Sequence, residues 1–383
     1  MNFRFLTAGE SHGRGLVGII EGIPANLKID FEQIHKQLKR RKMGYGRGSR
    51  QKIESDEMEI LTGVRHGKTL GSPLTMVIWN KDFKNWTEIM SVTPIDKESP
   101  RQVHIPRPGH ADYIGGKKYD QTDMRNILER ASARETAMRV GLGSIARLFL
   151  QALGIEIASR VVSVGGIDDE TKCPSDISSL NDELDKSPLR VISEQACQKM
   201  VNKIDEAKNK GDSVGGVFEV ICTGLPLGLG SYIQWDKRLE GDIAKAFMSL
   251  NAIKGVEVGL GFESAHRFGS EVHDEMELKD NSVAFKTNKT GGIIGGMSSG
   301  EPIVVRAAMK PIATLMKPLD SVDLKDEKAA KAHVERSDYC AVPAAAVIGE
   351  SLLALTLAGS MMTKFGGDSM SEIKSRLDTW RNG

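Results

Sequence analysis

Residues 106–154 read PRPGHADYIGGKKYDQTDMRNILERASARETAMRVGLGSIARLFLQALG, and they decide how the rest of the chain is organised. From Thr122 to Gly154 apolar and small residues recur at three- and four-residue steps, which predicts one long helix with a buried face. Thr122 is a candidate N-cap and Gly154 a candidate C-cap, so the predicted helix is about 45 Å long. The loop before it places His110 and Asp112 in a Pro- and Gly-rich turn. We therefore expect a buried helix whose polar, cationic start lies beside a histidine loop.

The composition excludes several classes of protein. The chain has 383 residues and a formal net charge of +1, so no overall field attracts a nucleic acid. Its four cysteines form no CxxC pair, which predicts neither a zinc site nor a disulfide framework, and we expect a reducing, cytoplasmic environment. The first residues, MNFRFLTAGESHG, lack the apolar segment of a signal peptide. The apolar run 341–362 is interrupted by Glu350, which favours a buried core helix over a membrane span.

Short strands and helices are expected along the rest of the chain. Strands are predicted at 3–6, 15–21, 72–80, 155–167, 215–226 and the start of 301–315. Helices are predicted at 31–42 after an Asp30 cap, 194–211 after a Ser193 cap, 238–255, and the second half of 335–359. Irregular structure is predicted at 80–106, 168–190 and 276–300. No repeat or linker divides the sequence, so we favour one large α+β unit.

The first candidate for chemistry is the segment GESHG at 9–13. Glycines on both sides of Ser11 and His12 permit unusual backbone dihedral angles and a close approach by a ligand. A histidine in such a turn can transfer protons near neutral pH. A structural histidine at a corner between two strands explains the same pattern.

The second candidate is the basic loop RRKMGYGRGSR at 40–50. Guanidinium groups among flexible glycines match the geometry of carboxylates and phosphates, so this loop can fold around a polyanion. A solvated basic loop is the alternative. Binding to RNA or DNA is a further reading, although the loop lacks a series of interleaved aromatic side chains.

The third candidate is the segment RPGHAD at 107–112. Pro108 and Gly109 fix a turn, and Asp112 is close enough in sequence to orient the imidazole of His110. A Ser–His–Asp hydrolase triad is conceivable, but the GxSxG elbow is absent from the sequence. Two histidines beside glycines favour an acid/base site that uses both.

Later segments add candidates for binding a charged ligand. The glycine cluster GGIIGGMSSG at 291–300 and the turn KPIAT at 310–314 can present backbone N–H groups to a phosphate. Neither matches a Walker A or a Rossmann motif, and a glycine-rich hairpin is the alternative for the cluster. Arg336 and Asp338 form either a simple ion pair or a charged pair in a cleft. The sequence contains no HExxH, CxxC or DxD motif, so we predict no built-in metal site.

Taken together, these segments resemble the chorismate synthase family. GESHGRGLVGIIEGIP at 9–24, ERASARETAMRVGLGSI at 129–145 and RSDYCAVPAA at 336–345 are similar to the three signatures of that family. RRKMGYGRGSR, RPGHAD, SLNAIKGVEVGLGFE, GGIIGGMSSG and MKPIATL also occur in family order. The resemblance extends from about residue 3 to about residue 365 of the 383.

The resemblance implies a fold and a reaction. The fold would be an α+β, β-α-β sandwich with helices between two antiparallel sheets, as a single large domain over 1–383 with a C-terminal tail helix at roughly 366–383. The assembly would be a homotetramer. The reaction would be the 1,4-anti elimination of phosphate from 5-enolpyruvylshikimate 3-phosphate to give chorismate, in the shikimate pathway. Reduced FMN would be required without net redox change, supplied through NADPH or, as we favour, by a separate flavin reductase.

The resemblance also implies roles for individual residues. The catalytic residues would be His12, His110 and Asp338. The substrate would be bound by Arg41, Arg47, Arg50, Arg107, Arg134 and Arg336. FMN would be bound by Arg130, Ala131, Ser132, Asn251, Ala252, Gly295, Lys310, Pro311, Ile312, Ala313, Thr314 and Arg336. The family's nicotinamide-nucleotide contacts would fall on Arg41 and Arg47.

Two other functions compete with this reading. A non-catalytic polyanion- or RNA-binding protein would use the arginine loop, and its binding would survive loss of both histidines. A phosphatase or hydrolase would use His12 and His110 and would release phosphate in air without flavin. We favour the flavin-dependent lyase, which makes a small molecule the partner rather than a nucleic acid or a membrane.

Overall fold

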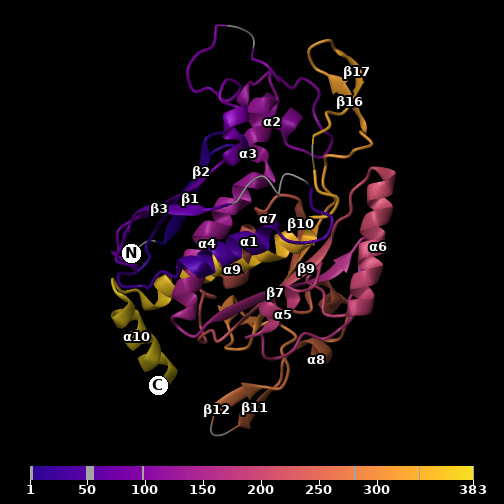
Figure 1. Ribbon diagram of the computed structural model, residues 1–383. Helices are drawn as coiled ribbons and strands as arrows, with labels where there is room; N and C mark the ends of the chain where they lie inside the picture. Colours follow the sequence, from indigo (N-terminus) through magenta and orange to yellow (C-terminus); the bar gives the residue numbers. More distant parts are fainter. Residues whose placement is uncertain (1–2, 49–55, 97–98, 280–281, 336, 383) are drawn as a thin grey trace.

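Two antiparallel sheets carry most of the strands in the computed structural model, which describes residues 3–48, 56–96, 99–279, 282–335 and 337–382 (Figure 1). The first sheet has the order β1-β2-β6-β3 and consists of β1 (Arg4–Ala8), β2 (Gly15–Glu21), β6 (Leu74–Trp79) and β3 (Met58–Thr62). The second has the order β10-β15-β9-β7-β8 and consists of β10 (Ile253–Val258), β15 (Ile303–Met309), β9 (Gly216–Thr223), β7 (Glu156–Val164) and β8 (Ile167–Asp168). The fold is therefore mixed helix and strand, as expected.

Helices and small hairpins complete the chain. The helices are α1 (Phe31–Lys42), α2 (Asp112–Tyr119), α3 (Arg125–Ala131), α4 (Thr136–Gln151), α5 (Leu180–Leu184), α6 (Glu194–Lys210), α7 (Leu239–Met248), α8 (Gly269–Val272), α9 (Val342–Phe365) and α10 (Met370–Asn382). Short 3-10 helices lie at η2 (Lys81–Asn85), η3 (Ala133–Glu135), η4 (Trp235–Lys237) and η5 (Gly261–His266). The two-stranded hairpins pair β4 (Val64–Arg65) with β5 (Lys68–Thr69), β11 (Met276–Lys279) with β12 (Ser282–Phe285), β13 (Ile293–Ile294) with β14 (Met297–Ser298), and β16 (Asp320–Asp323) with β17 (Lys328–Lys331).

Helix α4 packs on the first sheet. Along β2, Leu16 and Ile20 are fully buried, as the alternation of a strand with one covered face requires. Gly18 lies between them, and a Cβ there would come within 2.5 Å of the Met138 sulfur. A side chain at this position would therefore push α4 away from the sheet.

Helix α9 packs on both α4 and the second sheet. A Cβ on Gly143 of α4 would come within 2.4 Å of the Ser351 Cβ on α9, and one on Gly349 would come within 2.7 Å of the Phe218 ring on β9. Helix α9 is long and apolar enough to cross a membrane, with a mean hydropathy of 1.6, but 89% of its most apolar window is buried inside the fold. It is a core helix, and the prediction for 341–362 is confirmed. One apolar cluster extends from Leu16 to Leu377, so the described chain forms one unit.

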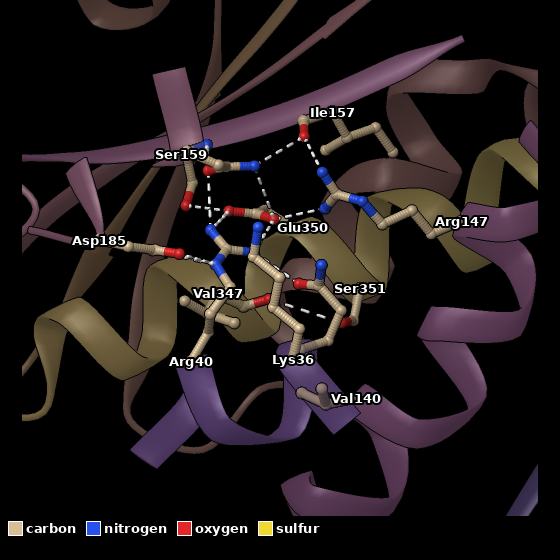
Figure 2. A network of polar contacts seen from close by, with 12 residues as sticks. Lys36, Arg40, Val140, Arg147, Ile157, Ser159, Asp185, Val347, Glu350 and Ser351 are labelled. Carbon is tan, nitrogen blue, oxygen red and sulfur yellow. Dashed lines mark hydrogen bonds and ion pairs between the residues drawn. The ribbon is translucent and has the colours of Figure 1, made fainter. Parts of the chain in front are cut away.

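A buried polar network fastens α1 to α4, β7 and α9 (Figure 2). The Glu350 carboxylate, 1% exposed, accepts two hydrogen bonds of 2.8 Å from Arg40 and one of 2.6 Å from the Ser159 hydroxyl. Arg147 also donates to Glu350, and Arg40 pairs with Asp185 at 2.9 Å. Burial alone would raise the pKa of Glu350, but Arg40 and Arg147 lower it well below the usual range. The carboxylate is therefore ionised inside the core.

The prediction of one long helix from Thr122 to Gly154 is wrong. The structure has α3, then an extended Ser132 (φ −64°, ψ 141°), then η3 and a sixteen-residue α4. Ser132 ends α3 because its hydroxyl accepts the backbone N–H of Arg134, a local bond that competes with the helical ladder. At the start, the Asp123 carboxylate, not Thr122, accepts a backbone N–H, that of Arg125.

The prediction of a helix over 238–255 is also wrong at its end. Helix α7 stops at Met248, and β10 begins at Ile253 after a turn in which Ala252 has a φ of +67°. The segment 276–300 contains the β11–β12 and β13–β14 hairpins, and 168–190 contains α5. The caps at Asp30 and Ser193 are confirmed, since each side chain accepts a backbone N–H three residues on.

Candidate active site

A cleft of about 410 Å³ collects residues from distant parts of the chain, within the usual size range of ligand pockets. We call it the central cleft. Most of the predicted site residues line it: His12, Arg41, Arg47, Arg107, His110, Ala131, Ser132, Arg134, Asn251, Ala252, Lys310, Ile312, Ala313, Thr314 and Asp338. Its apolar wall includes Leu128, Leu250, Met309, Ala344, Ala345 and Ile348.

Three predicted residues do not line the central cleft. Arg130 is exposed and donates to the Thr7 and Gly9 carbonyls, and Pro311 lies outside the lining. Gly295 lies in the β13–β14 turn, next to Gly296, whose carbonyl accepts the N–H of Leu239 at the start of α7. The cleft lies at the other end of α7, where Leu250 and Asn251 follow the helix. Gly295 is therefore separated from the cleft by the length of this ten-residue helix, about 15 Å. Arg50 and Arg336 lie outside the described residues.

His12 lies in the loop between β1 and β2, against α3. Its Nδ1 is 2.9 Å from Glu129 Oε1, and its ring stacks on Trp86 with 3.8 Å between centroids and 19° between planes. Ser132, the residue at which α3 ends, also contacts this loop: its hydroxyl accepts a hydrogen bond of 3.0 Å from the Ser11 hydroxyl. The histidine is 8% exposed, so it is held on most sides and open towards the cleft that it lines.

His110 lies at the start of α2 and is paired with a fully buried carboxylate. Its Nδ1 is 2.5 Å from Asp112 Oδ1, and Asp112 Oδ2 accepts from Arg107 Nε at 2.8 Å. Burial alone would raise the pKa of Asp112, but the hydrogen bonds from His110 and Arg107 lower it well below the usual range. The predicted orientation of His110 by Asp112 is confirmed.

Two arginines of the cleft share one buried carboxylate. Arg41, at the end of α1, donates to Asp56 Oδ2 at 2.8 Å, and Arg134 donates to Asp56 Oδ1. Burial opposes ionisation of Asp56, but the two guanidinium groups lower its pKa to about 2. Arg134 also donates to Asn80 Oδ1, and the Asn80 amide donates to the Gly13 carbonyl at 2.8 Å. The cation is thereby tied to the loop that carries His12.

The basic loop reaches the cleft through Arg47. Its Nη1 is 2.8 Å from Asp338 Oδ2, and the backbone N–H of Gly48 donates to Asp338 Oδ1 at 2.6 Å. Asp338 therefore lies in the cleft paired with Arg47, while the predicted pair of Asp338 with Arg336 involves a residue outside the described ranges. On the opposite side, burial and then the charge of Lys254 lower the pKa of Lys310, and Thr314 accepts from Arg107 at 3.0 Å.

Three polar atoms of the cleft residues lack a hydrogen-bond partner. Within the described parts of the chain, the Nε atoms of Arg41 and Arg47 and the Oδ1 of Asn251 are buried without a hydrogen-bond partner. Buried polar groups in proteins are normally paired, so such atoms indicate a missing partner. Two donors and one acceptor beside an apolar wall suit an anionic ligand with a flat ring system. Among the described residues, no group of three or more His, Cys, Asp or Glu side chains is placed to hold a metal ion.

Comparisons with known proteins identify the family of the chain. A family model described as chorismate synthase matches residues 3–362. The chain belongs to the chorismate synthase family. The chorismate synthase of Listeria innocua serovar 6a is 50% identical over 382 residues, which cover 99% of this chain and 98% of that protein. That of Aquifex aeolicus is 52% identical over 387 residues, with 99% and 97% covered. A crystal structure of a chorismate synthase has a TM-score of 0.79 and 43% identity, covering 100% of this chain and 98% of that one.

Membership of the chorismate synthase family makes the chain an enzyme, a lyase of the shikimate pathway that acts on a small molecule and uses a flavin. The alternative of a non-catalytic RNA-binding protein receives no support from these relatives. Sequence reasoning missed Trp86, Glu129, Asp56 and Asn80, which hold the cleft residues in place. Glu129 lies inside the second family signature, Asp56 lies in a polar stretch, and Asn80 ends the predicted strand 72–80, but no motif singles out Asp56 or Asn80.

Proposed function

We propose that this chain converts 5-enolpyruvylshikimate 3-phosphate to chorismate and phosphate by 1,4-anti elimination in the central cleft. The observation that carries this proposal is the convergence of two histidines and four arginines from distant segments on one cleft: His12, Arg41, Arg47, Arg107, His110 and Arg134. The substrate has two carboxylates and a phosphate, and guanidinium groups bind such anions through paired hydrogen bonds. Arg50 and Arg336 belong to the same proposed anion site.

Three residues of the cleft are proposed to move protons. His12 donates a proton to the leaving phosphate, a role for which an imidazole is suited near neutral pH. His110 lies on the flavin side, where it would protonate reduced FMN or balance the negative charge of the cofactor, and its pairing with Asp112 supports this role. Asp338 accepts the proton that originates at C6 of the substrate.

The residues present fit reduced FMN. We propose that Ala131, Ser132, Asn251, Ala252 and the turn from Lys310 to Thr314 hold it, with Lys310 at the phosphate and Asn251 Oδ1 accepting a ring N–H. When bound, reduced FMN supplies electron density that helps to expel phosphate and takes up the hydrogen from C6. Arg130, Gly295 and Pro311 stay predicted contacts of the cofactor, although they do not line the cleft of the single chain.

The same proposal includes the sandwich architecture, the oligomeric state, the cellular location and the source of reduced flavin. The packing of α4 on the first sheet and of α9 on the second supports a β-α-β sandwich over residues 1–383, with 366–383 as the tail that contains α10. We further propose a cytoplasmic homotetramer that binds no nucleic acid and no membrane. Its flavin is reduced by a separate flavin reductase, or by NADPH bound at Arg41 and Arg47.

An anaerobic assay tests this function. The purified chain is mixed with chemically reduced FMN and 5-enolpyruvylshikimate 3-phosphate, and chorismate and phosphate are measured together. We expect equal amounts of both products and none with oxidised FMN in air. Phosphate release in air without flavin would instead identify a phosphatase.

A further inference from the structure

Glu129 lies directly behind His12 and is 3% exposed. We propose that Glu129 is a positioning residue that fixes His12 with its proton on Nδ1, so that Nε2 is the ring atom that exchanges a proton with the ligand. This inference rests on the proposed role of His12 and deepens it. It concerns the state of the histidine before any ligand binds.

Three donors meet the Glu129 carboxylate. Its Oε2 accepts the backbone N–H of His12 at 2.8 Å and lies 3.1 Å from Nδ1, and its Oε1 lies 2.9 Å from Nδ1. Arg125 Nη1 donates to Oε1 at 3.1 Å. An ionised carboxylate only accepts hydrogen bonds, so Nδ1 must carry the hydrogen in this contact. In the neutral ring Nε2 is then the free base, and the described residues give it no hydrogen-bond partner.

The environment keeps this carboxylate ionised. Burial alone would raise the pKa of Glu129, but the hydrogen bonds from His12 and the charge of Arg125 lower it. The Nδ1 hydrogen is held by this carboxylate, so proton exchange at His12 occurs at Nε2.

Stacking holds the ring in the same orientation. Trp86 covers one face of His12, and two cations lie over the indole, Arg101 at 4.7 Å and Arg125 at 5.2 Å from its centroid. Arg125 thus contacts both Glu129 and Trp86. Rotation of the imidazole, which would exchange its two nitrogens, would break the carboxylate contact and the stack together.

The substitution Glu129→Gln tests the proposal without changing the size of the side chain. The amide can donate to Nδ1, which favours the opposite tautomer. We expect kcat to fall by about 10²- to 10⁴-fold, the range contributed by a positioned general acid, with KM changed by no more than about threefold. Glu129→Asp should recover part of kcat, because it restores the ionised acceptor. Asn126→Ala on the same helix, which does not touch His12, should behave like the wild type.

The tautomer itself is measured by long-range ¹H–¹⁵N NMR on protein with ¹⁵N-labelled histidine, with His12 assigned from its loss in His12→Ala. We expect the neutral imidazole of the wild type to carry its proton on Nδ1 and that of Glu129→Gln to carry it on Nε2. A wild-type proton on Nε2 overturns the proposal, and so does a Glu129→Gln variant with unchanged tautomer and kcat. The wild-type spectrum needs no active enzyme, and its assignment needs only that His12→Ala folds, so absence of lyase activity would count against the proposed function alone.

Discussion

The substitution Glu350→Gln should destabilise the protein strongly, because it removes the negative charge that Arg40 and Arg147 share in the core (Figure 2). Arg190 pairs with the same carboxylate at 3.5 Å. Asp185 would remain to pair with Arg40 and Arg190. Breaking a buried ion pair from one side typically costs about 3–5 kcal/mol. With an m-value of about 3 kcal/mol/M, this lowers the urea midpoint by about 1–1.7 M at pH 7.

The pH dependence gives a second check on Glu350. Its pKa is lower in the folded protein than in the unfolded chain, so its contribution is present above the ordinary glutamate value of about 4.3 and is lost as the pH falls towards the lowered value. The difference in midpoint between wild type and Glu350→Gln should therefore shrink on acidification. Glu206→Gln is the matched control, because its pairs with Lys203 and Lys210 are exposed and should add nothing measurable. Equal midpoints for the two variants would refute the reasoning.

Three further predictions concern the cleft and its frame. Lys310→Met should weaken FMN binding by roughly 10- to 100-fold, as expected for a lost hydrogen bond to a charged group. Quenching of flavin fluorescence measures this, and unchanged binding would show that Lys310 does not bind the phosphate. Asp112→Asn should lower kcat by about 10²-fold or more, since His110 and Arg107 lose their buried ionised acceptor. The anaerobic assay measures kcat, and an unchanged kcat would contradict the role of His110. Gly18→Val should cost about 1–3 kcal/mol by overpacking against Met138, measured by urea unfolding; full stability would show that α4 can move freely.

Local patterns in the sequence predicted the elements whose ends are chemically marked. Helix α1 follows the Asp30 cap, and α6 runs from the Ser193 cap to Gly211 with a φ of +69°. The break at Ser132 was missed because apolar residues keep their helical spacing across it, while the cause is a single hydroxyl bond. The end of α7 was missed for a different reason. The turn at Ala252 leads into β10, and β10 pairs with β15, which lies about fifty residues further along the chain.

The candidate site was predictable in its residue types but not in its supporting contacts. His12 and His110 stand out because each lies in a glycine-rich turn, and the family resemblance puts both at one site. Nothing in the sequence indicates that Glu129 lies behind His12 or that Asp56 joins Arg41 to Arg134. Glu129 is 117 residues from His12 and Asp56 is 78 residues from Arg134. Such pairs follow from tertiary packing, and only the structure reveals them.

The central claim is that the two histidines and the arginines of distant segments serve one ligand site. A crystal structure with oxidised FMN and 5-enolpyruvylshikimate 3-phosphate bound tests it most directly. We predict both molecules in the central cleft, with His12 and His110 each within hydrogen-bond distance of a ligand and Arg107 and Arg134 in contact with substrate anions. Ligands bound elsewhere, or His12 and His110 facing separate molecules on unrelated surfaces, would contradict it.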